Sequence, residues 1–214
     1  MKKDIADIRH DYQLKSLLEA DVSPNPYNQF TAWWNQAIES RIDEVNAMTI
    51  TTASATGVPS ARIVLLKSVD EEGFVFFTNY NSKKGNDLEE NPKASLVFFW
   101  KELERQVRIS GIVKKINAAY SDEYYNSRPL GSRIGAWASP QSTVIASREV
   151  IEKNIIEIES RFTANNISRP PHWGGYIVMP TVIEFWQGRP SRLHDRVQYT
   201  LMKGTEWKIE RLAP

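Results

Sequence analysis

The sequence predicts a mainly β protein with peripheral helices, an α+β fold built on an antiparallel barrel. About eight short runs rich in β-branched and aromatic residues follow one another at hairpin spacing. Helical patterns stand before and between these runs, without the βαβ alternation of a parallel sheet. The 214 residues contain no repeat, linker or low-complexity tract, so we expect one domain over 1–214 with an N-terminal helical segment over about 1–45.

The N-terminal segment is predicted to be helical. Residues 4–19 have apolar side chains at a loose helical spacing with charges between them. Asn25 is expected to cap a second helix whose first residue is Pro26. The apolar face of that helix would contain Tyr27, Phe30, Trp34, Ala37 and Ile38.

Beyond Asn46 the composition becomes typical of strands. Ala47–Ala53 is rich in Thr, Ile and Met, and 57–59 (Gly-Val-Pro) predicts a turn. Helical composition returns at 118–126 and 147–162. The predicted strands are Ser60–Leu66, Phe74–Thr78, Ser95–Trp100, Gln106–Ile116, Gly175–Val178, Val182–Trp186, Arg196–Leu201 and Trp207–Arg211.

Composition argues against several classes of function. The 27 Lys and Arg against 26 Asp and Glu give a net charge of +1, unlike a nucleic-acid binder. Without cysteine the chain has no disulfide, thiolate nucleophile or sulfur-ligated metal, and its three histidines form no ligand pair, so no metal site is predicted. No apolar run approaches the roughly 18 residues of a membrane span, and no secretory pattern opens the chain. We therefore expect a cytoplasmic protein that does not enter a membrane.

Two basic clusters could bind anions. Arg62 and Lys67 bracket four apolar residues, and about 17 Å would separate their Cα atoms along an extended strand. They could contact two anionic groups or two ends of one ligand, although composition alone favours a buried strand with solvated ends. The run 78–85 combines hydroxyls, Lys83, Lys84 and a predicted helix start, which suits phosphate. A solvated basic loop is the alternative, and Walker spacing is missing.

Two further segments carry polar side chains that could bind a ligand. Alternation places Glu104, Gln106 and Arg108 on one face of a strand, with Arg105 and Val107 on the other. If buried, Gln106 needs a partner, either a ligand amide edge or neighbouring backbone. The run 127–142 has arginines, hydroxyls and glycines, which indicate an anion cradle or a polar loop between helices.

The fifth cluster is cationic. In extended geometry Arg192, His194 and Arg196 share one face, where they repel one another unless an anion lies between them. A structural histidine is the alternative reading of His194.

Together and in this order, these runs resemble one enzyme family. They are RIVLLK (62–67), FTNYNSKKG (77–85), LERQVR (103–108), SRPLGSRIGAWASPQS (127–142), IEFWQG (183–188) and RLHDR (192–196). The resemblance is to pyridoxine/pyridoxamine 5′-phosphate oxidase and runs from about Arg9 to Pro214. It implies a split β-barrel of the FMN-binding type and a homodimer with shared active sites. It also implies oxidation of pyridoxine or pyridoxamine 5′-phosphate to pyridoxal 5′-phosphate, with O₂ as electron acceptor and H₂O₂ as product.

The resemblance also assigns roles to residues. The implied FMN contacts are Arg62, Ile63, Val64, Leu65, Leu66, Lys67, Phe77, Thr78, Lys83, Lys84, Gln106, Gln141, Ser142, Trp186 and Arg196. The last four of these are expected to come from the other subunit. The implied substrate contacts are Arg9, His10, Asp11, Tyr12, Lys67, Tyr124, Arg128, Ser132, Arg192, Leu193 and His194. Arg192 and His194 are the expected catalytic pair over the substrate ring, and 9–12 is a segment that can close over the pocket.

Two positions depart from the family pattern, and three other functions stay open. Lys83 stands where the family often has Arg, which puts bidentate phosphate contact in doubt, and Phe77 stands where Tyr is common. The alternatives are another flavin oxidase of this barrel type, such as one in phenazine-type biosynthesis, a carrier without turnover, and a nucleic-acid module using Trp33 and Trp34. Lys67, Tyr124, Arg128 and Ser132 together suit a phosphate ester, which favours the oxidase.

Overall fold

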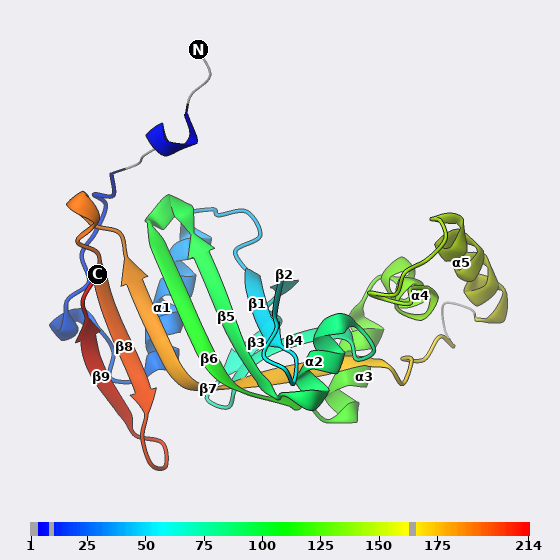
Figure 1. Ribbon diagram of the computed structural model, residues 1–214. Helices are drawn as coiled ribbons and strands as arrows, with labels where there is room; N and C mark the ends of the chain where they lie inside the picture. The colour runs from blue at the N-terminus through cyan, green and yellow to red at the C-terminus, as the bar shows by residue number, and fades with distance from the viewer. Residues whose placement is uncertain (1–3, 9–10, 163–165) are drawn as a thin grey trace. The chain divides into compact units, whose positions relative to one another are not determined.

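The computed structural model describes residues 4–8, 11–162 and 166–214 (Figure 1). The chain divides into two compact units. Unit 1 comprises Met1–Thr49, Ser95–Gly111 and Pro180–Pro214, and unit 2 comprises Ile50–Ala94 and Ile112–Met179. The single-domain expectation stays a prediction.

In the described part of the chain, nine strands form one sheet. Hydrogen-bonded neighbours follow the order β2-β1-β5-β6-β7-β4-β3, and β8 pairs with β7 and β9. The pairs β3–β4, β4–β7, β7–β8 and β8–β9 are antiparallel. The bounds are β1 Ala47–Ala53, β2 Pro59–Leu65, β3 Ser68–Asp70, β4 Gly73–Asn79, β5 Lys93–Trp100, β6 Arg105–Lys115, β7 Trp173–Gln187, β8 Asp195–Leu201 and β9 Trp207–Leu212. The predicted mainly β fold with added helices is confirmed.

In unit 1, helix α1 (Pro26–Glu39) supplies the aromatic core. Asn25 caps it as predicted, because its side-chain oxygen accepts a hydrogen bond from the Tyr27 amide at 2.8 Å. Phe30 and Trp33 are buried, with ring centroids 5.3 Å from Phe98 and 5.2 Å from Phe185 respectively. The helix therefore covers unit 1 strands through aromatic packing.

Unit 2 contains the remaining α-helices of the described residues: α2 (Lys83–Glu90), α3 (Ala118–Ser127), α4 (Leu130–Ala138) and α5 (Glu149–Arg161). Figure 1 shows α4 and α5 side by side, where Ile134, Ala138 and Ile158 share an apolar cluster. Across the described ranges, every helix is too short or too polar to span a lipid bilayer.

The segment predicted to be helical over 4–19 contains only two 3₁₀ turns among its described residues. They are η1 (Ile5–Asp7) and the start of η2 (Glu19–Asp21). The reason is tertiary, because backbone N–H groups of this segment donate to Glu104 and Asp195 side chains rather than to a helical ladder. The helical prediction for 4–19 is therefore wrong.

Three further elements differ from the prediction. The strands expected at 175–178 and 182–186 are one strand, β7, in which Pro180 falls between the residues paired with β4 and those paired with β8. The run 127–142, interpreted as an anion cradle or a polar loop between helices, contains helix α4. The short strand β3 was not predicted.

Candidate active site

A cavity of about 520 Å³ in unit 2 gathers many of the predicted site residues. Its wall, which we call the wall of the cationic cavity, contains several of the predicted FMN contacts. It also contains the four residues that together suit a phosphate ester, Lys67, Tyr124, Arg128 and Ser132. The lining residues are Ile63, Val64, Leu65, Lys67, Phe77, Thr78, Asn79, Lys84, Tyr124, Arg128, Pro129, Ser132, Gln141 and Trp173. The fold thus brings runs that are far apart in sequence to one place.

An aromatic stack forms one side of this cavity. The Phe77 ring lies 4.0 Å from Tyr124 and 5.4 Å from Trp173 between centroids, in stacked geometry. The Arg128 guanidinium lies 4.6 Å from the Trp173 centroid, and Lys67 Nζ lies 5.8 Å from the Tyr124 centroid. The rings therefore hold two cations at the cavity wall. Phe77, which stands where the family commonly has Tyr, still provides an aromatic ring that stacks on Tyr124.

Arg128 has an unmet hydrogen-bonding requirement. Its Nη1 atom is buried and, among the described residues, has no hydrogen-bond partner. Burial lowers the pKa of Arg128. Because a buried guanidinium donor normally has an acceptor, this atom fits an anionic group of a ligand.

Lys84, at the start of α2, is a second buried cation. Its Nζ donates to Thr78 Oγ1 at 2.9 Å, and the residue is 6% exposed. Burial and the positive charge of Arg62 lower the pKa of Lys84 to about 8. Arg62 is held by Thr52 Oγ1, to which its Nη1 donates at 2.8 Å. An anion at this point would stabilise both cations, so the donor set fits a phosphate-bearing cofactor.

Lys83 is engaged elsewhere. Its ammonium forms an ion pair with Asp87, and its side chain is half exposed and outside the cavity wall. Burial acts to raise the pKa of Asp87, but hydrogen bonds from Lys83 and Thr52 outweigh this and lower it. Asp87, which sequence reasoning missed, thereby links Lys83 to the Thr52 hydroxyl that holds Arg62. Its spacing of four from Lys83 was the available signal.

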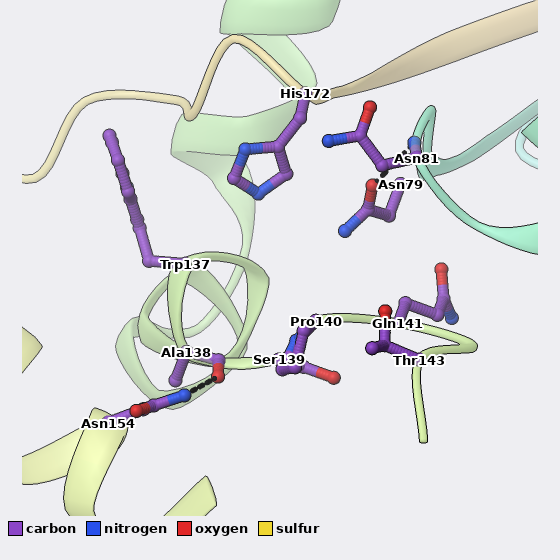
Figure 2. A pocket seen from close by; sticks show the side chains of 10 residues that line it. All are labelled: Asn79, Asn81, Trp137, Ala138, Ser139, Pro140, Gln141, Thr143, Asn154 and His172. Carbon is purple, nitrogen blue, oxygen red and sulfur yellow. Dashed lines mark hydrogen bonds between the residues drawn. The ribbon is translucent and has the colours of Figure 1, made fainter. Parts of the chain in front are cut away.

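A second cavity of about 270 Å³ lies in unit 2 (Figure 2). Figure 2 shows amide, hydroxyl and imidazole side chains around it, and the described residues of its wall include neither Lys nor Arg. Asn79 and Gln141 line both cavities. Gln141 Oε1 accepts a hydrogen bond from Thr78 at 3.4 Å, so one chain brings Gln141 to the cationic cavity by itself. Ser142 is exposed, has a φ of 70° and lines neither cavity.

Unit 1 contains a separate aromatic cluster. The Trp186 and His194 ring centroids lie 4.6 Å apart, and Tyr12 lies edge-on, 5.6 Å from Trp186. His194 Nδ1 accepts a hydrogen bond from the Arg189 amide at 3.1 Å, which places the ring proton on Nε2 in the neutral form. Burial and the charge of Arg192 lower the pKa of His194, so the imidazole is mostly neutral at pH 7.

The geometry around Arg192 corrects an expectation. Pro190–Arg192 forms a 3₁₀ turn, η4, in which Arg192 has a φ of 62°, and β8 starts only at Asp195. Arg192, His194 and Arg196 therefore do not lie on one face of a strand. Leu193 follows the turn and is 69% exposed.

Arg196 is fixed by a carboxylate that sequence reasoning missed. Its Nε and Nη2 donate to the two oxygens of Glu184, at 2.8 and 3.2 Å. Arg108 Nη1 lies 3.1 Å from Oε2 of the same carboxylate. Glu184 is buried, with 4% of its surface exposed. The hydrogen bond to Glu184 raises the pKa of Arg196. In the antiparallel pairing of β7 with β8, Glu184 lies opposite Gln198 and Trp186 lies opposite Arg196. This register brings Glu184 close to Arg196.

The remaining predicted site residues divide into three groups. Gln106 is half-buried on β6, and Arg105 and Val107 lie on the opposite, buried face, which alternation had assigned to them without its burial. Glu104 is buried in a left-handed turn before the strand. Leu66 belongs to the core. Arg9 and His10 lie outside the described residues. The roles of all these residues toward cofactor and substrate stay predictions.

Two family models together match most of the chain. A family model for pyridoxamine 5′-phosphate oxidase matches residues 34–162, and one for the pyridoxine 5′-phosphate oxidase C-terminal dimerisation region matches 173–214. Proteins named pyridoxine/pyridoxamine 5′-phosphate oxidase from Nostoc sp. and Cyanothece sp. are 57% and 58% identical, over 100% and 98% of each chain. The crystal structure of PhzG from Burkholderia lata, in complex with tetrahydrophenazine-1-carboxylic acid, has 29% identity and a TM-score of 0.87, covering 94% of this chain and 100% of that one.

The fold and these matches define an FMN-binding split-barrel protein, which confirms the fold implied by the sequence resemblance. The chain belongs to the pyridoxamine 5′-phosphate oxidase family.

Proposed function

We propose that this protein oxidises pyridoxine or pyridoxamine 5′-phosphate to pyridoxal 5′-phosphate, with FMN as cofactor, O₂ as electron acceptor and H₂O₂ as product. The cavity that places Lys67, Arg128 and Lys84 in one wall carries this proposal, together with Arg128 Nη1, which has no hydrogen-bond partner among the described residues. Substrate and cofactor each bring a phosphate, and the cavity offers cations for both. The names and full-length identity of the relatives support the same reaction.

The chain's own residues bind and orient the reactants. Arg62, Lys84 and Thr78 are proposed to hold the cofactor phosphate, because burial and mutual repulsion of the two cations favour an anion there. FMN, when bound, supplies the redox chemistry. Lys67, Tyr124, Arg128 and Ser132 are proposed to hold the substrate phosphate through charge-assisted and hydroxyl hydrogen bonds.

A homodimer is part of the proposal. The match of residues 173–214 to a dimerisation region supports it. We propose that Arg192 and His194 of one protomer orient the substrate bound in the cavity of its partner, with neutral His194 offering Nε2–H as a donor. In a two-fold dimer this gives two equivalent sites. A cytoplasmic location stays a prediction, to be checked by cell fractionation.

A visible spectrum tests the reaction. The purified protein should be yellow, and anaerobic pyridoxamine 5′-phosphate should bleach it, with colour returning and peroxide forming when O₂ is admitted. A colourless protein that FMN cannot reconstitute contradicts the proposal. Colour without bleaching or peroxide would indicate a carrier, and O₂ consumption with tricyclic phenazine precursors alone would indicate the phenazine-type oxidase.

A further inference from the structure

We infer that Glu104 is a positioning residue that fixes residues 11–17, here called the strap, against the turn that carries Arg192 and His194. The inference rests on the proposed function in so far as that turn serves the substrate site. All contacts that carry it lie within unit 1.

The side chain of Glu104 holds the strap. Its Oε2 atom accepts hydrogen bonds from the backbone amides of Gln13 at 2.8 Å and Leu14 at 3.0 Å. The residue is 4% exposed, so water competes little for this carboxylate. Two charge-assisted bonds to consecutive amides give the strap a defined conformation where no helix forms.

The backbone of Glu104 binds the end of β7 and the residue that follows it. Its carbonyl accepts hydrogen bonds from the Gly188 amide at 2.7 Å and from Gln187 Nε2 at 3.2 Å. The residue has a φ of 54° and a ψ of 40°, a left-handed conformation that turns its side chain and carbonyl toward these different groups. One residue therefore joins the strap to the segment that follows β7.

The approach at Gly188 is close. A Cβ atom placed on Gly188 would lie 2.6 Å from Tyr12 Cγ and 3.0 Å from Glu104 Cβ. Only glycine fits between the strap and Glu104 at this point. The fit indicates a packed arrangement of the three residues rather than a chance contact of the strap with the surface.

The strap thereby contacts the turn that carries Arg192 and His194. The Tyr12 ring lies edge-on to Trp186 and to His194, with centroids 5.6 and 5.9 Å away. Asp11 Oδ1 accepts a hydrogen bond at 3.2 Å from the amide of Ser191, the residue before Arg192. Loss of the Glu104 carboxylate should therefore loosen both contacts, while Asp195 still holds the strap at Leu17.

Limited trypsin digestion of the holoenzyme tests the strap directly, since Lys15 follows the two clamped amides. Glu104→Ala should speed cleavage after Lys15 at least tenfold, whereas Glu104→Gln, which keeps an acceptor oxygen, should stay within about threefold of wild type. Glu102→Ala is the matched control, because Glu102 is exposed and pairs only loosely with Lys101 at 4.0 Å. Wild-type cleavage in Glu104→Ala overturns the inference. If that variant does not fold, Glu104→Asp decides, since its shorter carboxylate should give an intermediate rate.

Steady-state kinetics test the positioning role. Glu104→Ala should raise the KM for pyridoxamine 5′-phosphate at least tenfold, with kcat within about threefold and an unchanged FMN-to-protein ratio, and Glu104→Gln should restore most of the KM. A general loss of fold would instead lower FMN content. Faster cleavage with a wild-type KM overturns the positioning role. A wild-type protein that oxidises no substrate overturns the proposed function, and the cleavage rates still decide whether Glu104 holds the strap.

Discussion

Lys84 Nζ donates a hydrogen bond to Thr78 Oγ1 across 2.9 Å, at the wall of the cationic cavity. Burial and the charge of Arg62 hold the pKa of this lysine near 8, below the 10.5 of an ordinary lysine. The folded protein therefore binds fewer protons than the unfolded chain between these values. By linkage, the ligand-free protein gains stability from Lys84 as pH rises through that window.

Binding of a phosphate beside Lys84 should raise the lowered pKa of this lysine, so that Lys84 takes up a proton. An anion beside Lys84 raises its pKa, so FMN binding at pH 9 should consume roughly one proton per site. At pH 6.5 Lys84 is already charged, so binding should show no proton uptake, and the partly protonated FMN phosphate should release protons instead. Titration calorimetry in two buffers of different ionisation enthalpy measures this uptake. Lys84→Met should abolish it, whereas Lys83→Met should not, because Lys83 is exposed and paired with Asp87. Equal uptake at both pH values would contradict the placement of an anion at Lys84.

Arg62 and Arg192 should differ in which property they control. Arg62→Ala should weaken FMN retention more than turnover of the reconstituted enzyme, and Arg192→Ala should do the reverse. A charge-assisted hydrogen bond contributes about 1.5–3 kcal/mol, so each effect should be tenfold or larger. FMN dissociation constants and steady-state kinetics measure both. Normal kcat and KM in Arg192→Ala would show that this side chain is not at the reacting ring.

Mixed dimers should recover activity if sites are shared. Lys67→Ala and Arg192→Ala are each expected to be nearly inactive, but after subunit exchange one pocket of a mixed dimer receives an intact copy of both residues. With half the dimers mixed and half their pockets intact, activity should reach roughly a quarter of wild type. Oxygen consumption measures it, and mass spectrometry confirms the exchange. No recovery after confirmed exchange would mean that one chain builds the whole site.

The Glu184 carboxylate should contribute strongly to stability. Glu184→Ala leaves Arg196 and Arg108 close together without their common acceptor, and should lower the free energy of unfolding by about 1.5–3 kcal/mol. Glu210→Ala is the control, because the Lys208–Glu210 ion pair is exposed and such pairs contribute at most about 1 kcal/mol. Urea unfolding measures both variants. A loss in Glu184→Ala no larger than in Glu210→Ala would contradict the pairing.

The local patterns of the sequence predicted most strands, the cap at Asn25 and the runs that line the cationic cavity. Their success is physical, since alternation and capping depend on near neighbours in the chain. The strap failed for the opposite reason. Its apolar spacing suggests a helix, but Glu104 and Asp195, about 90 and 180 residues away, accept its amide hydrogens instead.

The partners of two buried carboxylates could not be predicted from the sequence either. Glu184 reaches Arg196 only through the pairing of β7 with β8, and Glu104 meets the strap only in the folded unit. Arg105 is a further case, since alternation assigned its face but not its burial. Its guanidinium lies 4.2 Å from the Trp33 centroid and donates to the Gln187 amide oxygen at 2.9 Å. These two neutral partners of Arg105 come from α1 and β7, which are distant in the sequence, so its burial could not be predicted from its own strand.

Trp173 gives the cationic cavity an optical reporter. Its indole lies in the cavity wall, with the Arg128 guanidinium 4.6 Å from its centroid. Flavins absorb at the wavelengths where tryptophan emits, so a flavin entering this cavity would accept the excitation of the indole and dim its fluorescence. A Trp173→Phe variant would separate that signal from the emission of the other tryptophans. Filling and emptying of the cavity could then be followed by light in the native chain, without an attached dye.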